Sequence, residues 1–423
     1  MLVLVSSIIF EDKLVLVPIG IGSLHISDVL LIALLLKIYY RNMTDNHYFL
    51  AQSPLNLSLG LFYSYVVVTA LVSVICYGME FAIVFKALRV FSYYLVYFLV
   101  TNLIRERKQI ELVVVGMYVI AVFVAVAMLA QVFVGDSVQI IPGRIEQAET
   151  IDQAYDALRL LPPGQTLLYV MLITTVCLIT LEARNVTRLS YYLGLAGLLG
   201  AGVMLTYNRS YWVAIVLALI FLYLMISGRH RSRFLLVSLS AVTAMAVFIT
   251  IGMNYPSSRE YIVSMAERFS SLGAGDDLIQ SGSIADRFNE NEYAMKKIAE
   301  NPLFGIGLYN DYRPQIYEPE DDLTHYVHNG YLWLLVDMGI VGFLLFAWFY
   351  VGFIVRCWRN WRYIKDSRSQ ALVVGFMLSA IGIIPMALLN PVYFQWFSII
   401  VLGTIAGLCD SILNENGGVQ IVG

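Results

Sequence analysis

Long apolar stretches of about 20 residues recur along this 423-residue chain, and they restrict its fold more than any other feature. A helix of about 20 apolar residues spans the hydrocarbon core of a bilayer. Hydrophobic residues make up 59% of the sequence and charged residues 13%, whereas soluble domains carry about 25% charged residues. We therefore predict an all-α polytopic membrane protein.

The apolar stretches predict about twelve transmembrane helices. The first is the least regular, because Glu11, Asp12 and Lys13 interrupt it. The approximate bounds of the predicted spans are 2–22, 26–40, 56–77, 80–104, 110–134, 165–183, 188–206, 211–227, 234–253, 331–355, 370–390 and 393–411.

Basic residues indicate the orientation of these spans. Lys and Arg gather in alternate loops, for example at 105–108 and 356–368, and such loops face the cytoplasm. Both termini are then cytoplasmic, and the two longest polar stretches, 135–163 and 254–330, face outward. This divides the chain into a first part of the bundle, a large outer loop and a last part of the bundle: 1–253, 254–330 and 331–423.

The outer loop between spans 9 and 10 is predicted to form a helical cap on the periplasmic or extracellular side. Residues 283–300 read as an amphipathic helix, which Asn301-Pro302 ends. A Gly-Ile-Gly turn follows. The predicted apolar face consists of Ile284, Phe288, Met295 and Ile298, which share one side at helical spacing.

Three basic residues stand at or inside the membrane. Arg209 occupies a short outer turn, where its planar guanidinium group either binds phosphate oxygens or anchors a helix end by snorkelling. Lys86 and Arg89 lie one turn apart inside the 80–104 span. Charges there usually line a cavity, although a tilted helix with snorkelling side chains also accounts for them. Together the three suit an anionic ligand with a tail in the bilayer, such as a lipid diphosphate.

The outer loop carries further candidates for chemistry. His328 directly precedes the 331–355 span, and histidine has the ordinary pKa best suited to proton transfer near neutrality. His325 is a candidate supporting or substrate contact. Arg287 opens the amphipathic helix, where it either acts on a substrate or pairs with Asp286 as a solvated charge.

Other classes of function find little support. The balance of 27 basic and 30 acidic residues gives no basis for a nucleic-acid partner. P-loop and dinucleotide-binding fingerprints do not occur, so neither an ATPase nor a redox enzyme is indicated. An acidic run predicts a solvated loop instead of a metal site, because Pro319 interrupts it: Glu318, Glu320, Asp321 and Asp322.

Several of these elements occur in a fixed order over about residues 190–350, and this order resembles the O-antigen ligase/O-antigen polymerase superfamily. The elements are Arg209 in an outer turn, Arg287, Asn301-Pro-Leu-Phe-Gly-Ile-Gly307, His328-Asn-Gly-Tyr-Leu332 and Asp337-Met-Gly-Ile-Val-Gly342. The first half of the chain matches this superfamily by topology alone.

The resemblance implies an inverting, metal-independent glycosyltransferase of the multi-spanning (GT-C) type that needs no cofactor. Its donor would be an undecaprenyl-diphosphate-linked oligosaccharide at the outer face of a bacterial inner membrane. Arg209 and Arg287 would stabilise the diphosphate, and His328 would be the catalytic histidine. The family turn often reads Ser-Arg, whereas Asn208 precedes the arginine here.

The expected partners follow from the same resemblance. A polymerase, which we favour, extends another lipid-linked glycan, and a ligase transfers the glycan to a lipid A core. Membrane lipids, a flippase and a chain-length regulator are further expected partners. His325, Asn329 and Tyr331 would support the site or contact the glycan. A polysaccharide or small-molecule transporter is the alternative from another class.

Overall fold

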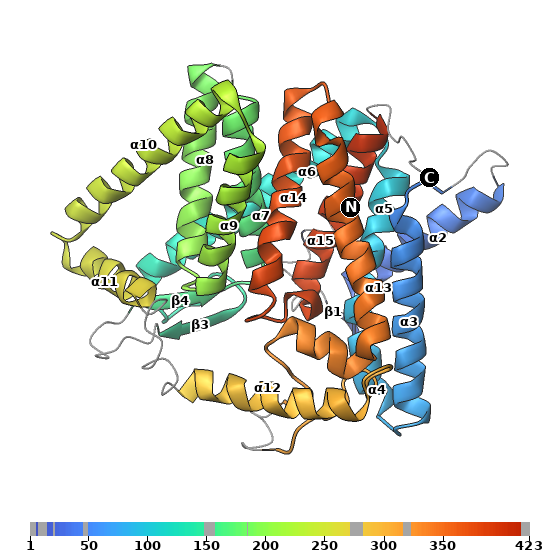
Figure 1. Ribbon diagram of the computed structural model, residues 1–423. Helices are drawn as coiled ribbons and strands as arrows, with labels where there is room; N and C mark the ends of the chain where they lie inside the picture. The colour runs from blue at the N-terminus through green and yellow to red at the C-terminus, as the bar shows by residue number, and fades with distance from the viewer. Residues whose placement is uncertain are drawn as a thin grey trace. The chain divides into compact units, whose positions relative to one another are not determined.

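The computed structural model describes residues 6, 15–19, 22–44, 50–147, 157–183, 185–270, 282–315 and 323–415, and it is predominantly helical (Figure 1). Most of the predicted first span and the acidic run of Glu318 to Asp322 lie outside these residues. The chain forms two compact units. Unit 1 comprises Met1–Val115, Gly282–Tyr363 and Ile383–Gly423, and unit 2 comprises Gly116–Ser281 and Ile364–Gly382.

Unit 1 contains most of the first and last helices of the chain. Its elements are β1 (Val15–Ile19), β2 (Gly22–His25), α2 (Ile26–Thr44), α3 (Leu55–Ile75), α4 (Phe81–Ser92), η2 (Tyr93–Leu95), α5 (Val96–Leu103), α12 (Gly282–Glu300), α13 (Gly330–Asn360), η3 (Trp361–Tyr363), η4 (Val392–Phe394) and α15 (Trp396–Glu415). Strands β1 and β2 form an antiparallel hairpin. Helix α3 packs along α13, and α5 packs along α15. Buried aromatic rings fill the core between these helices, with Phe62 in contact with Phe91, Tyr94 and Phe346.

Unit 2 is built around the buried helix α7. Its elements are most of α6 (Arg107–Val134), β3 (Arg144–Gln147), β4 (Leu158–Leu161), α7 (Gln165–Leu181), α8 (Val186–Met204), α9 (Arg209–Met225), α10 (Gly228–Gly252), α11 (Pro256–Ser270) and most of α14 (Ser367–Met386). Helices α8, α9 and α10 all contact α7. Strands β3 and β4 pair antiparallel.

Each predicted span from 26–40 onward coincides with a helix of the structure. Within the described residues, seven helices are long and apolar enough to cross a membrane: Leu55–Ile75, Phe81–Leu103, Arg107–Val134, Gly228–Gly252, Gly330–Tyr363, Ser367–Met386 and Trp396–Glu415. Helices α7 and α9 are apolar but shorter. The chain is therefore a polytopic membrane protein, while the number of twelve spans stays a prediction.

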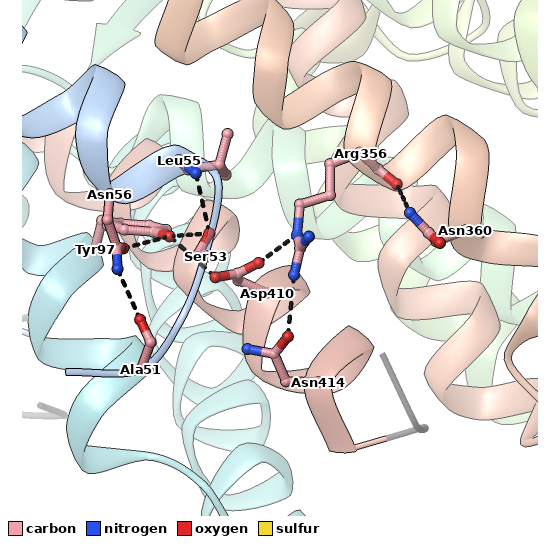
Figure 2. A network of polar contacts seen from close by, with 9 residues as sticks. All are labelled: Ala51, Ser53, Leu55, Asn56, Tyr97, Arg356, Asn360, Asp410 and Asn414. Atoms are coloured by element: carbon pink, nitrogen blue, oxygen red, sulfur yellow. Dashed lines mark hydrogen bonds and ion pairs between the residues drawn. The ribbon is translucent and has the colours of Figure 1, made fainter. Parts of the chain in front are cut away.

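A buried polar network joins three helices of unit 1 (Figure 2). Arg356 of α13 pairs with Asp410 of α15, and both side chains are at most 7% exposed. The Tyr97 hydroxyl of α5 donates to Asp410 Oδ2 at 3.0 Å, and Arg356 Nη2 donates to Asn414 Oδ1 at 3.0 Å. Because the buried charges are paired and hydrogen-bonded, the network fixes α5, α13 and α15 against one another.

Candidate active site

Helix α13 is interrupted near its start. Gly339 has φ 61° and ψ −168°, which is not a helical conformation. In an unbroken helix, the carbonyl groups of Val336 and Asp337 would accept from the N–H groups of Ile340 and Val341. The break leaves these four backbone groups in need of other partners, because buried polar groups of the main chain are costly when unpaired.

The Asn-Pro-Leu-Phe-Gly-Ile-Gly segment supplies those partners. It lies against the break, donates two backbone hydrogen bonds to α13 and accepts two from it. These four bonds satisfy the four backbone groups that the two missing helical bonds would have paired. The four bonds are Ile306 N to Val336 O at 2.8 Å, Gly307 N to Asp337 O at 3.0 Å, Ile340 N to Pro302 O at 2.9 Å and Val341 N to Leu303 O at 3.2 Å.

Two glycines permit this close approach of backbone to backbone. Gly305 has φ +71°, and a Cβ atom there would stand 2.6 Å from the backbone of Asp337. A Cβ atom on Gly339 would collide with the backbone of Leu303. The two glycine motifs recognised in the sequence, around 305 and around 339, are therefore two halves of one backbone junction.

His328 lies two residues before α13, and the three residues that follow it fix the start of this helix. Asn329 caps the helix, since its Oδ1 accepts from Tyr331 N at 3.0 Å and from Leu332 N at 3.2 Å. Gly330 N donates to Ala387 O at 2.8 Å. Tyr331 donates its hydroxyl to Ile384 O at 2.7 Å. Asn329 and Tyr331, predicted as supporting or glycan contacts, thus hold the start of α13 in place.

Glu290 of α12 is the immediate partner of His328. His328 Nδ1 lies 2.8 Å from Glu290 Oε2, and the backbone N–H of His328 donates to the same oxygen at 3.3 Å. Glu290 is 8% exposed. An ionised carboxylate only accepts hydrogen bonds, so with Glu290 ionised the contact needs a proton on Nδ1, and the neutral form of such a ring has Nε2 as its basic nitrogen.

Glu290 could not be singled out from the sequence, because carboxylates on a helix are usually solvated. Phe288 and Met295, predicted to share one apolar face, are 59% and 58% exposed, whereas Glu290 and Ala294 are buried and Ile298 of the apolar face is partly buried. Figure 1 shows α12 lying across the end of α13, which it contacts. Glu290 and Ala294 follow Arg287 at helical spacing on the side of α12 that the protein covers, and Phe288 and Met295 lie outside that side.

Arg287 lies one turn before Glu290 on α12, so the two residues share a side of the helix. Its side chain is partly buried. Unit 1 therefore carries Arg287 on the helix that holds His328.

Arg209 belongs to unit 2, where it is the first residue of α9. Asn208 caps this helix, accepting from Ser210 N at 3.3 Å and from Ser210 Oγ at 2.8 Å. Tyr207 before it has φ 49°, and its buried ring packs against Tyr261 of α11. Asn208 therefore has a capping function here, and the turn that presents Arg209 is anchored on both sides.

The two charges predicted inside the membrane have different surroundings. Arg89 lies 3.8 Å from Asp28 Oδ2, and Asp28 also accepts from the Tyr93 hydroxyl at 2.9 Å. Lys86 instead lies close enough to His325 to influence its pKa. Burial is the main cause that lowers the pKa of His325, and the positive charge of Lys86 lowers it further. Lys86 therefore belongs to the electrostatic surroundings of the histidine segment, while Arg89 has an ion-pair partner of its own.

Aromatic rings support the two histidines of the outer loop. Tyr309 stacks on His325 with ring centroids 4.5 Å apart. Tyr326 meets His328 edge to face at 4.8 Å, and Trp333 packs against Tyr326 at 5.1 Å. The histidine segment therefore rests on a layer of packed rings at the start of α13.

Residues 194–347 match the O-antigen ligase family. This segment runs from α8 into α13 and covers just over a third of the chain. It contains Arg209, Arg287 and His328 together with both halves of the backbone junction, while Lys86 and Arg89 lie outside it. No curated protein matches the chain.

Proposed function

We propose that this chain, which belongs through residues 194–347 to the O-antigen ligase/O-antigen polymerase superfamily, is a membrane glycosyltransferase. It moves a glycan from an undecaprenyl-diphosphate donor to an acceptor hydroxyl at the outer face of a bacterial inner membrane. One observation carries the proposal: His328 stands at the start of a membrane-spanning helix with Nδ1 on a buried carboxylate. Such a ring offers Nε2 as a base.

The proposed reaction is a single displacement. His328 Nε2 takes the proton of the acceptor hydroxyl while that oxygen attacks the anomeric carbon. The bond from the anomeric carbon to the phosphate oxygen breaks, and the lipid diphosphate leaves with the electron pair. Attack opposite to the leaving group inverts the anomeric centre.

Arginines offset the charge that develops on the departing diphosphate. The resemblance to the family assigns this role to Arg287 on α12 and to Arg209 at the start of α9. Guanidinium groups suit this task, because they stay charged and form paired hydrogen bonds with phosphate oxygens. Lys86, which already acts on His325, adds positive charge to the same side of unit 1, and Arg89 contributes from its pair with Asp28. No bound metal or cofactor is needed in this scheme.

The acceptor in our proposal is a second lipid-linked glycan, which makes the protein a repeat-unit polymerase. One kind of substrate then serves as both donor and acceptor. A flippase would deliver this substrate, and a chain-length regulator would limit the product. The name of the matched family favours a second candidate, an O-antigen ligase that uses a lipid A core as acceptor.

Reconstitution tests the proposal directly. The purified protein is placed in liposomes with an undecaprenyl-diphosphate-linked repeat unit, and the product lipids are separated by length beside a His328→Ala variant. A ladder that the variant cannot make supports a polymerase. Product that forms only after addition of a lipid A core identifies a ligase. Folded protein that makes no His328-dependent product with either acceptor overturns the proposed function.

A further inference from the structure

We propose that Glu290 is the positioning residue of His328: its carboxylate fixes the imidazole with Nε2 available to the acceptor and stabilises the imidazolium that forms. This inference rests on the proposed function, in which His328 is the base. Glu290 acts through the histidine and does not itself touch the substrate.

The geometry distinguishes Glu290 from two other carboxylates of α12, Glu292 and Glu300. Glu292 pairs with Lys296 at 2.7 Å, and Glu300 pairs with Lys297 at 2.7 Å. Both are exposed pairs of neighbouring turns, which is the usual arrangement on a solvated helix. Glu290 is instead buried, and its hydrogen-bonded partner lies 38 residues further along the chain.

A single oxygen of Glu290 makes both contacts. Oε2 accepts from the ring at Nδ1 and from the backbone N–H of His328. Two bonds to one residue fix both the position of its main chain and the rotation of its ring. Tyr326 limits the ring further through its edge-to-face contact at 4.8 Å.

The charge of Glu290 matters during proton transfer. Before the reaction the pair consists of a carboxylate and a neutral imidazole. After Nε2 has taken the acceptor proton, the pair consists of a carboxylate and an imidazolium, which attract each other in a partly buried site. The positive charges of Arg287 on the same helix and Lys86 near His325 oppose that protonation. Glu290 therefore supplies the compensating negative charge.

Glu290→Gln separates the charge from the shape. Because one oxygen accepts both hydrogen bonds, the amide oxygen of glutamine can accept both, and only the negative charge is lost. We expect kcat to fall about 100-fold, within the range that base catalysis contributes, while KM for the lipid-linked donor stays within about twofold. Glu290→Ala loses the orientation as well and should lower kcat further.

Glu292→Gln is the matched control. It makes the same chemical change on the same helix, at an exposed residue paired with lysine, and should leave kcat and KM as in the wild type. If Glu290→Gln keeps wild-type kcat while His328→Ala is inactive, Glu290 only fastens the loop and the inference is refuted alone. If His328→Ala remains active, the proposed function fails with it.

A second measurement needs no change at Glu290. The chain has 5 histidines, and ¹⁵N-histidine NMR of the protein in nanodiscs identifies His328 by its loss in the His328→Ala spectrum. At a pH high enough for the imidazole to be neutral, the ring of His328 should show a protonated Nδ1 and an unprotonated Nε2. A ring protonated at Nε2 would overturn the proposal whatever the kinetics show.

Discussion

Gly305→Ala tests the backbone junction between the 302–307 segment and α13. A Cβ atom at Gly305 would stand 2.6 Å from the backbone of Asp337, and the residue has φ +71°. The left-handed conformation costs a non-glycine residue about 1–2 kcal/mol. Relief of the clash moves the segment away and breaks the bonds of Ile306 and Gly307, at about 1 kcal/mol each. The expected loss of stability is therefore about 3–4 kcal/mol.

Gly78→Ala supplies the control for this change. Gly78 has φ +66°, nearly the same backbone conformation, but nothing lies within 4 Å of its Cβ position. It should lose only the conformational part, about 1–2 kcal/mol. Unfolding of both variants is followed by tryptophan fluorescence in mixed micelles with increasing denaturing detergent. If the two substitutions destabilise the protein equally, the close contact at Gly305 is absent from the folded protein and the reasoning is wrong.

Three further predictions concern other parts of unit 1. Asp410→Ala leaves Arg356 buried without its carboxylate and should lower the free energy of unfolding by about 3–5 kcal/mol in the same assay. The double variant Asp410→Leu, Arg356→Met should regain most of that stability, and no recovery in it would contradict the prediction. Lys86→Met removes a positive charge that lowers the pKa of His325. The pKa of His325 in this variant should therefore rise in an NMR titration, and an unchanged or lower pKa would show that Lys86 does not act on His325. Arg287→Ala should lower kcat about 100-fold, as expected for loss of one charge-stabilising group. Arg287→Lys should recover only part of the lost activity, because lysine lacks the planar guanidinium group. Full activity in Arg287→Ala would exclude Arg287 from the mechanism.

The helices of this protein could be predicted from sequence because the bilayer sets their length. Apolar stretches of about 20 residues identified α2, α3 and α6 to α9 within a few residues of their bounds, and one stretch, 80–104, covers α4, η2 and α5 together. The same method could not establish how many cross the membrane, because α2 and α8, both predicted as spans, are not among the seven described helices that are long and apolar enough to cross. It also missed the hairpin of β1 and β2: β1 was included in the predicted 2–22 span, and β2 lies almost entirely between that span and the next.

The candidate site was predictable only where the signal was local. His328 stood out by residue type and by its place beside a membrane span, and Arg287 gained its role through the resemblance to the family. Glu290 did not, because its partner is distant in sequence and carboxylates on a helix are usually solvated. The pairing of Arg356 with Asp410 was hidden for the same reason: each lies near the end of a different helix, and only packing brings them together.

The junction and the Glu290–His328 pair together explain how α12 and α13 hold the base in place. Helix α12 ends at Glu300, and the segment that joins to the break in α13 begins two residues later. The segment after α12 is thus fixed to α13 through backbone hydrogen bonds at residues 336–341. Within α12, Glu290 forms a second attachment through its hydrogen bond to His328. Two separate attachments prevent α12 from rotating about either one. A short motif without a catalytic side chain can therefore matter to catalysis, because it sets the distance and angle at which Glu290 meets the imidazole.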